Sequence, residues 1–424
     1  MKKLFKPYLG LKREIYIIFI SKTINAMGAL IGPFMTLLLS KKIGLSSAET
    51  GFYVAVLGFL FVPSSLIGGK LSDTYGRKRV LIIFELIAAV GYVACIFIQP
   101  SMNLVYVLMA TTFCFGVAGP SHDAMTADLT TPEQRQGAFS LNYLGFNFGF
   151  AISQIFAGFL FENHFVWMFI IDGITALIGI LLIAVFVKET STNTKHSESK
   201  DIKIKELKQS AKSSTIAVLF SKPILMYFAL ATIGYRFVYS QWSFMIPLHA
   251  EANFVNEGAK LYGLLGTFNA TIVVICTPLI TLAFGKFTHI RRIFYSGLLF
   301  TVGFGMLGFV STKTAFFTSV FIFTLGEILE AISSVPFIMS HAPASHRARI
   351  SSILSLLIGT GYTMGSLVMG SVLEIASFEV CWKISATVVL IAAILMKLLE
   401  KYDNKNTCRI EIGNYVDTKN VLSQ

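Results

Sequence analysis

The chain has 424 residues and a net charge of +12, and 54% of its residues are hydrophobic while only 14% are charged. Soluble domains carry about 25% charged residues, so this composition argues against a soluble globular protein. The apolar runs are continuous and do not alternate with polar residues, which argues against a β-barrel and predicts an all-α polytopic membrane protein.

Twelve apolar stretches of the sequence have the length, about 20 residues, that a helix needs to cross a bilayer. We number them as spans one to twelve, and they cover residues 14–38, 49–71, 80–98, 104–127, 137–161, 165–187, 223–248, 261–284, 293–311, 314–340, 350–373 and 380–399. Span one follows a lysine-rich start and contains Lys22. Because its apolar part is too long for a signal peptide and lacks a small-residue cleavage site, we expect an uncleaved helix.

The Lys and Arg residues are distributed unequally over the two sides of such a bundle. If both termini lie on one side, that side carries 28 of the 35 Lys and Arg residues, the opposite loops carry five, and two lie inside spans. Cytoplasmic loops of membrane proteins carry this kind of excess. The sequence therefore predicts a plasma-membrane protein with both termini in the cytoplasm, and its basic charge indicates topology and not nucleic-acid binding.

The loop between spans two and three, residues 69–79, has the sequence GKLSDTYGRKR. Its basic residues suit a cytoplasmic anchor, but an anchor does not explain the acidic residue or the two glycines. The pattern resembles the loop 2–3 signature of the major facilitator superfamily, which implies a gate that helps to lock the cytoplasmic side. Thr74 departs from that signature, which usually has a basic residue there. The matching gate positions are Gly69, Asp73, Gly76, Arg77 and Lys78.

Residues 127–153, ADLTTPEQRQGAFSLNYLGFNFGFAIS, look like the loop between spans four and five of drug:proton antiporters. Asp128 ends span four in this segment, and we assign it to the same gate as the 69–79 loop. Two positions differ from that antiporter pattern. Thr111 and Thr112 stand where an arginine is usual, and residues 153–158 replace the usual Gly-Pro-x-x-Gly-Gly of span five.

Several ionisable residues lie inside the first six predicted spans, where an uncompensated charge costs about 2.5–3.5 kcal/mol. Asp123 in span four is interpreted as a proton relay or an inner-mouth carboxylate, and the adjacent His122 as a helix-contact residue. Lys22 and Glu85 lie at comparable depth, so either they pair or Lys22 extends toward the lipid headgroups. Asp172, in the outer third of span six, is expected to face water.

A polar, lysine-rich segment separates the first six spans from the last six. Part of it, IKIKELKQS, is interpreted as an amphipathic surface helix or as solvated linker. A shift of 212 residues superposes Arg79 on Arg291 and Arg135 on Arg347, at loop–helix junctions. The predicted organisation is two pseudo-symmetric six-helix halves, as in transporters with internal repeats. The boundaries are 1–187 for the first half, 188–222 for the linker, 223–399 for the second half and 400–424 for a cytoplasmic tail.

Span seven contains YSQWSFMIPLH and span ten contains LGEILEAISSVPF, and both are similar to segments of a multidrug-exporter subgroup. By residue count Arg236 and Glu327 lie near the midplane, and Glu330 lies one turn from Glu327 on the same face. Glu327 is interpreted as a proton site or as the permanent partner of Arg236, and Glu330 and Arg236 as candidate substrate contacts. Candidate lining residues for a cavity that holds an aromatic or cationic solute are Tyr235, Tyr239, Gln241 and Trp242.

The resemblance implies the major facilitator fold and a secondary transporter that exports lipophilic or cationic drugs in exchange for protons by alternating access. Two alternatives stay open: a dedicated exporter or importer of one metabolite, such as a sugar, a peptide or a metallophore, and a membrane sensor or scaffold that transports nothing. The sequence has no phosphate-binding loop, metal-ligand spacing or nucleophile elbow, so we expect no enzyme, no metal and no cofactor. The expected partners are a small-molecule substrate, protons and the lipid bilayer, and the expected assembly is a monomer.

Overall fold

The computed structural model describes residues 8–190, 219, 221–343 and 346–422, and its regular elements in these ranges are helices. Up to residue 190 they are α2 (Arg13–Met27), α3 (Met35–Leu37), the π-helix η2 (Leu38–Ile43), α4 (Ser47–Tyr75), α5 (Arg77–Cys95), α6 (Met102–Asp128), α7 (Pro132–Asn163) and α8 (Phe165–Phe186). From residue 221 they are α11 (Pro223–Tyr239), η3 (Ser240–Trp242), α12 (Met245–Asn253), α13 (Gly258–Ala283), α14 (His289–Gly305), η4 (Met306–Gly308), α15 (Lys313–His341), α16 (Arg347–Ile375) and α17 (Phe378–Leu422). Most of the predicted 188–222 linker, including IKIKELKQS, lies outside the described residues.

Nine helices of the described part of the chain are long and apolar enough to cross a membrane: α4, α6, α7, α8, α13, α14 with η4, α15, α16 and α17. They confirm nine of the predicted spans. Span three corresponds to α5, which has only 19 residues and carries three basic side chains and Glu85. Spans one and seven are each divided into shorter helices. Span twelve was expected to end at residue 399, but α17 continues to Leu422.

The interruption in span one follows from its glycines and its proline. Helix α2 ends at Met27, and residues 28–34 separate it from α3. This stretch contains Gly28, Gly32 and Pro33. Glycine raises the entropic cost of a helix, and proline lacks the N–H that a helix interior needs. A continuous helix over 14–38 was therefore the wrong expectation.

Asp172 of α8 supports this interrupted stretch. Its carboxylate accepts hydrogen bonds from the backbone N–H groups of Leu30 (3.0 Å) and Ile31 (3.2 Å). Only 2% of Asp172 is exposed, so the expectation that it faces water was wrong. Backbone groups at membrane depth must find their partners inside the protein, and here a side chain from another helix supplies them.

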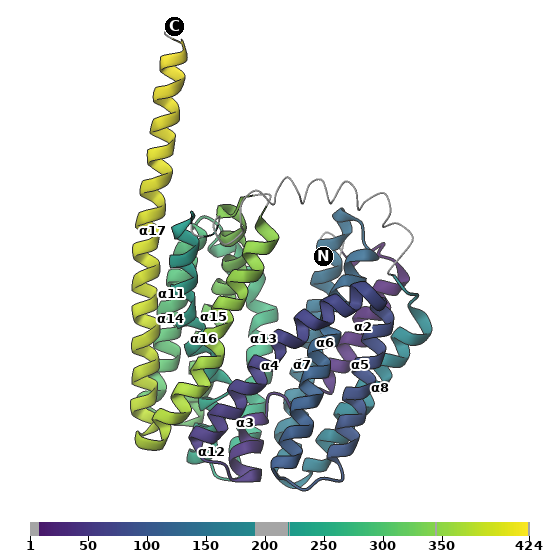
Figure 1. The fold of residues 1–424 in the computed structure, drawn as a ribbon. Helices are drawn as coiled ribbons and strands as arrows, with labels where there is room; N and C mark the ends of the chain where they lie inside the picture. Colours follow the sequence, from purple (N-terminus) through teal and green to yellow (C-terminus); the bar gives the residue numbers. More distant parts are fainter. Residues whose placement is uncertain (1–7, 191–218, 220, 344–345, 423–424) are drawn as a thin grey trace.

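The helices are arranged in two groups that stand side by side (Figure 1). Helices α2–α8 pack mainly on one another and form the first group, and α11–α17 form the second group. We call the end of the bundle that holds Gly76 and Asp128 the Gly76 end, and the opposite end, which holds Gly44 and Asn163, the Gly44 end. Each group thus supplies one wall of the space between them.

Two pairs of helices join the groups, α4 with α16 and α7 with α13. At the first contact Gly51 lies against Gly370, and at the second Gly158 lies against Gly263. Without side chains at these four positions the paired backbones approach closely, as small residues allow in membrane helices. A larger side chain at any of them would meet the backbone of the facing helix.

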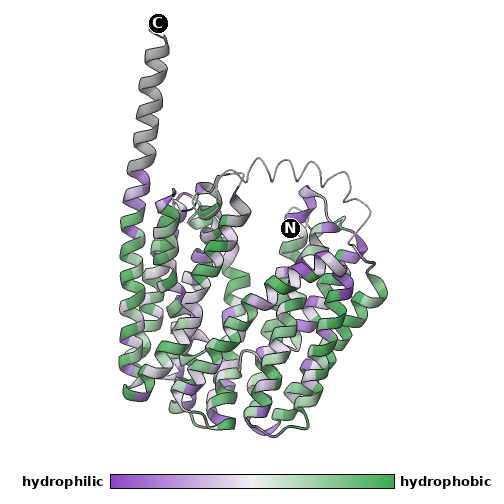
Figure 2. Ribbon diagram, viewed as in Figure 1, coloured by the Kyte–Doolittle hydropathy of each residue, from purple (hydrophilic) through white to green (hydrophobic). Residues whose placement is uncertain are grey.

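Hydrophobic residues cover the flanks of both groups, and hydrophilic residues gather at the ends of the helices (Figure 2). Large apolar side chains such as Phe97, Leu181 and Leu282 are 83%, 62% and 81% exposed. An apolar surface of this extent is unusual for a soluble monomer. It suits a protein whose flanks face lipid.

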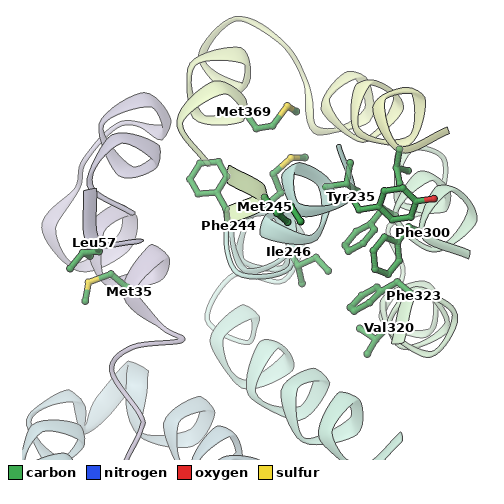
Figure 3. Close-up of a cluster of buried hydrophobic side chains, with 14 of the residues drawn as sticks. Met35, Leu57, Tyr235, Phe244, Met245, Ile246, Phe300, Val320, Phe323 and Met369 are labelled. Atoms are coloured by element: carbon green, nitrogen blue, oxygen red, sulfur yellow. The ribbon is translucent and has the colours of Figure 1, made fainter. Parts of the chain in front are cut away.

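The second group has an aromatic core beside its interrupted span. Figure 3 shows Tyr235, Phe300, Phe323 and Val320 gathered on one side of the segment that holds Phe244, and all of these side chains are buried. The hydroxyl of Tyr235 donates a hydrogen bond to the carbonyl of Ile293, 2.9 Å away. This packing holds α11 against α14, so the break at residues 240–244 occurs at a fixed place.

Candidate functional site

A cavity of about 720 Å³ lies between the two groups of helices. Among the described residues that line it, Glu327 is the one with an acidic or basic side chain. Eight of its 22 lining residues are aromatic, and a large space with many aromatic side chains and one charge suits an apolar or cationic small molecule. The aromatic lining residues are Phe61, Tyr143, Phe146, Phe150, Tyr239, Trp242, Tyr262 and Tyr362.

Glu327 lies midway along α15, at the wall of this cavity. Its Oε2 accepts a hydrogen bond from Asn269 Nδ2 of α13 at 3.0 Å. The same amide nitrogen donates to Thr324 Oγ1 at 2.8 Å. Two neutral donors, the Asn269 amide and the Tyr239 hydroxyl, therefore orient the carboxylate, and its remaining acceptor capacity is available to a proton or to a bound solute.

Arg236 forms an ion pair with Glu330. The alternative that Arg236 is the permanent partner of Glu327 is therefore wrong. Its Nη2 lies 2.9 Å from the Glu330 carboxylate, which also accepts a hydrogen bond from Ser334 Oγ at 2.8 Å. Glu330 is 3% exposed. Sequence reasoning placed both carboxylates on one face of the helix, but only contacts across helices decide which of them receives the arginine.

The four aromatic and amide residues predicted for the cavity wall have different positions. Tyr239 and Trp242 line the cavity. Tyr235 lies one turn earlier and packs in the core against Phe300, so it does not line the cavity. Gln241 is fully buried, and its Nε2 donates to the carbonyl of Phe237 at 2.9 Å. The change from α11 to the tighter η3 turns this amide back onto its own helix.

Residues 69–79 do not form the predicted loop but the end of α4, a break at Gly76 and the start of α5, and an ion pair lies beside the break. Gly76 has φ +101°, a conformation that favours glycine, and it ends α4 and begins α5. Arg77 forms an ion pair with Asp128 of α6 and donates from Nη1 to the carbonyl of Ala124 at 2.9 Å. Lys78 Nζ donates to the carbonyl of Ala184 at 2.6 Å. Three of the predicted gate residues thus tie α5 to α6 and α8 within the first group.

The remaining predicted gate residues make no such contact. Asp73 is exposed, and a side chain at Gly69 would meet open space. Glu189, which sequence reasoning overlooked, instead binds the start of α5: its carboxylate accepts from the backbone N–H groups of Arg77 at 2.9 Å and Lys78 at 3.1 Å. Helix N-termini bind anions in this way. The available signal was an acidic residue directly after span six.

The ionisable residues of the first group form two pairs. Lys22 Nζ lies 3.0 Å from Asp123 Oδ1, and His122 Nε2 lies 2.7 Å from Glu85 Oε1. The prediction that His122 contacts another helix is confirmed. Of the two alternatives for Lys22, the pair with Glu85 does not occur. Asp123 has a side chain that is 62% exposed, so it lies at the mouth of the first group and not in its core.

The groups are held together toward the Gly44 end. Lys41 pairs with Glu162 of its own group at 2.7 Å and with Glu251 of the second group. The backbone N–H of Ala48 donates to Glu374 at 2.8 Å, across the same boundary. Sequence reasoning treated Lys41 only as a loop charge, because its two acidic partners lie more than a hundred residues away.

A model of the Major Facilitator Superfamily matches residues 18–361 of the chain. The Na⁺, Li⁺, K⁺/H⁺ antiporter of Planococcus maritimus is 23% identical over 406 residues, which cover 89% of this chain and 93% of the relative. The class B tetracycline resistance protein of Escherichia coli is 24% identical over 349 residues, covering 80% and 83% of the two chains. A crystal structure of a mutant of the peptide transporter POT in complex with sulfate superposes with a TM-score of 0.77 at 14% identity, over 93% of this chain and 96% of that one, so this likeness concerns the fold alone.

Proposed function

The chain belongs to the Major Facilitator Superfamily, and from this premise we propose that it exports lipophilic, cationic small molecules in exchange for protons. We also propose that the chain crosses the membrane twelve times, in two six-helix halves that comprise residues 1–187 and 223–399. They are supported by nine long apolar helices together with α5 and the two interrupted spans. We further propose a monomer in the plasma membrane with both termini in the cytoplasm, because basic residues concentrate at the Gly76 end.

The observation that carries the proposal is Glu327 as the one charged side chain in the wall of an aromatic cavity. A carboxylate there binds a proton or attracts a cation, and the two compete for the same oxygens. Because Glu330 is already paired with Arg236, Glu327 is the carboxylate available for this competition. Competition of this kind produces exchange, and one proton that moves inward supplies about 2.3 kcal/mol per 100 mV.

The contacts between the groups support alternating access. The hydrogen bonds and ion pairs that join the groups in the described part of the chain lie toward the Gly44 end. The structure therefore corresponds to a conformer closed at that end. In the proposed cycle these contacts break while the Gly76 end closes.

The first prediction concerns Glu327→Gln. Glutamine keeps the size and the hydrogen bond with Asn269 but does not titrate, so we expect proton-driven export to be lost and the protein to reach the membrane normally. The measurement is efflux of a fluorescent lipophilic cation from proteoliposomes under an imposed pH gradient. Glu379→Gln, which removes an exposed carboxylate paired with Lys383, is the matched control and should export normally. Full export by Glu327→Gln would refute the proton role.

A second candidate, exchange of small monovalent cations for protons, is favoured by one observation. The antiporter of Planococcus maritimus aligns with 89% of this chain. A substrate panel in the same vesicles separates the candidates. If small monovalent cations are the substrate, alkali cations collapse the pH gradient and lipophilic cations do not. A response to one metabolite alone would favour a dedicated transporter, and no response to any solute would favour a sensor or scaffold.

A further inference from the structure

A buried histidine–carboxylate pair lies in the first group, separate from Glu327. His122 of α6 and Glu85 of α5 are 8% and 2% exposed, and His122 Nε2 lies 2.7 Å from Glu85 Oε1. The other polar atom of each side chain, His122 Nδ1 and Glu85 Oε2, is also buried and has no hydrogen-bond partner in the described part of the chain. Buried polar atoms are rarely left unpartnered, so this arrangement requires an explanation.

The short contact requires a proton between the two groups. Two acceptor atoms 2.7 Å apart repel, so Nε2 donates to Oε1 or a protonated carboxyl donates to Nε2. With Nε2–H and an ionised Glu85, Nδ1 keeps a free lone pair and the pair carries one negative charge. Uptake of a proton at Nδ1 makes an imidazolium and brings the net charge of the pair to zero. The unpartnered Nδ1 is the atom at which this step occurs.

The pair faces a cavity of about 390 Å³. The charged side chains that share its lining are Lys22 of α2 and Asp123 of α6, which pair with each other. Among the described lining residues, α4 and α8 contribute no charged side chain. The charge of this cavity is therefore set by the protonation of the His122–Glu85 pair itself.

This cavity brings the pair beside the exposed Asp123 and adjoins the central cavity. His122 lies six residues before the end of α6, which places it about 9 Å from the Gly76 end. Tyr143 and Phe146 of α7 line both this cavity and the one that holds Glu327. His122 thus shares one cavity with the exposed Asp123, and that cavity shares a wall with the one that holds Glu327.

We propose that the His122–Glu85 pair is a second proton-binding site of this transporter, located in the first group and coupled to transport through Glu327 in the second. The inference rests on the proposed function for its coupling to transport, but the site itself can be tested without any substrate. Proton binding at His122 changes the charge of the cavity in the first group, and proton binding at Glu327 changes the charge of the central cavity. The site is distinct from the ion-paired Arg236–Glu330, which has no free acceptor of this kind.

The binding of the proton is tested by ¹⁵N NMR of the histidine side chains in the full-length protein. The resonance that disappears in His122→Gln identifies the site, and we expect it to titrate in the wild-type protein. Its midpoint should move in Glu85→Gln, which removes the partner charge and keeps the shape. His249→Gln, at another buried histidine bonded to Trp382 and Ser311, is the control and should leave the His122 signal unchanged. A His122 signal that stays in one form across the pH range, or ignores Glu85→Gln, would overturn the proposal whatever the transport activity.

The coupling is tested in proteoliposomes by the steady-state accumulation of a lipophilic cation. At a gradient of about one pH unit, each coupled proton contributes about tenfold to the accumulation ratio. We expect His122→Gln and Glu85→Gln to lower the ratio by about this factor while gradient-free exchange of substrate continues, which also shows that the variants are folded. A wild-type accumulation ratio in both variants would refute the coupling. Absence of accumulation in the wild type would instead count against the proposed function, and the NMR titration would still decide the site.

Discussion

Arg236 distinguishes two carboxylates that lie one turn apart on α15. It neutralises Glu330, which also accepts from Ser334, and leaves Glu327 with two neutral partners, the Asn269 amide and the Tyr239 hydroxyl. The charge of Glu330 is thus already compensated by Arg236. The two acidic residues therefore serve different purposes: Glu330 fixes α11 against α15, and Glu327 remains able to exchange ligands.

At this scale we predict that Arg236→Met destabilises the protein. The change leaves Glu330 buried without a counter-charge, which costs about 3 kcal/mol. The measurement is the apparent melting temperature of the purified protein in detergent. A double variant with Glu330→Met should recover most of the loss, because both charges are then absent. If the double variant melted as early as the single one, the ion pair would not be the cause.

The interrupted helices show how individual elements are completed by others. Asp172 of α8 accepts hydrogen bonds from the backbone N–H groups of Leu30 and Ile31, which follow the end of α2. The break in span one therefore depends on a residue from span six. Glu189 does the same at the start of α5. Asp172 is buried in a helix of the membrane bundle, where no water replaces it, whereas Glu189 is exposed, so the break in span one depends more strictly on its neighbour.

At the level of the element we predict a graded effect at Asp172. Asp172→Leu leaves the Ile31 N–H without an acceptor and the Leu30 N–H with only the carbonyl of Gly28, 2.9 Å away, and an unpaired buried N–H costs about 1–3 kcal/mol. Asp172→Asn keeps one acceptor oxygen and should lose about half as much. Thermal unfolding of the two variants beside the wild type measures the order. Equal stability of Asp172→Leu and the wild type would show that the carboxylate does not support the break.

In the whole molecule, closure toward the Gly44 end combines packing with charge. Glycine contacts bring α4 against α16 and α7 against α13, and Lys41 bridges to Glu251 across the boundary. The glycine surfaces give close fit, whereas the ion pair is a contact that protonation or solvent entry weakens. The balance between conformers is therefore sensitive to this lysine.

For the whole molecule we predict that Lys41→Met shifts the population toward opening at the Gly44 end. Loss of the bridge leaves two partly buried carboxylates near each other, and a change of about 1–2 kcal/mol alters the population about 5–30-fold. Spin labels at the exposed residues Gln99 and Val255, one on each group, report the distance in a cysteine-free background. Lys313→Met, which removes the exposed pair with Glu257 inside the second group, is the control and should leave the distances unchanged.

Much of the architecture follows from the sequence because hydropathy and charge are local properties. Nine spans are long uninterrupted apolar runs, and burial in lipid requires a helix of each. Arg77 and Asp128 could be assigned to one gate from the family resemblance of the segments 69–79 and 127–153, and the two side chains form an ion pair. The breaks in spans one and seven were not predicted, because the sequence stays apolar at the positions where the helices are interrupted.

By itself the sequence determined the class of the protein, its family resemblance and the helix that carries Glu327. Only the tertiary structure decided the partners: Lys22 with Asp123, His122 with Glu85, Arg236 with Glu330, and Asp172 with the backbone of span one. The physical reason is geometric. A run of residues specifies that a helix forms and how deep each side chain lies, but which side chains meet depends on how each helix is rotated and on neighbours as far away as Glu251 is from Lys41, 210 residues.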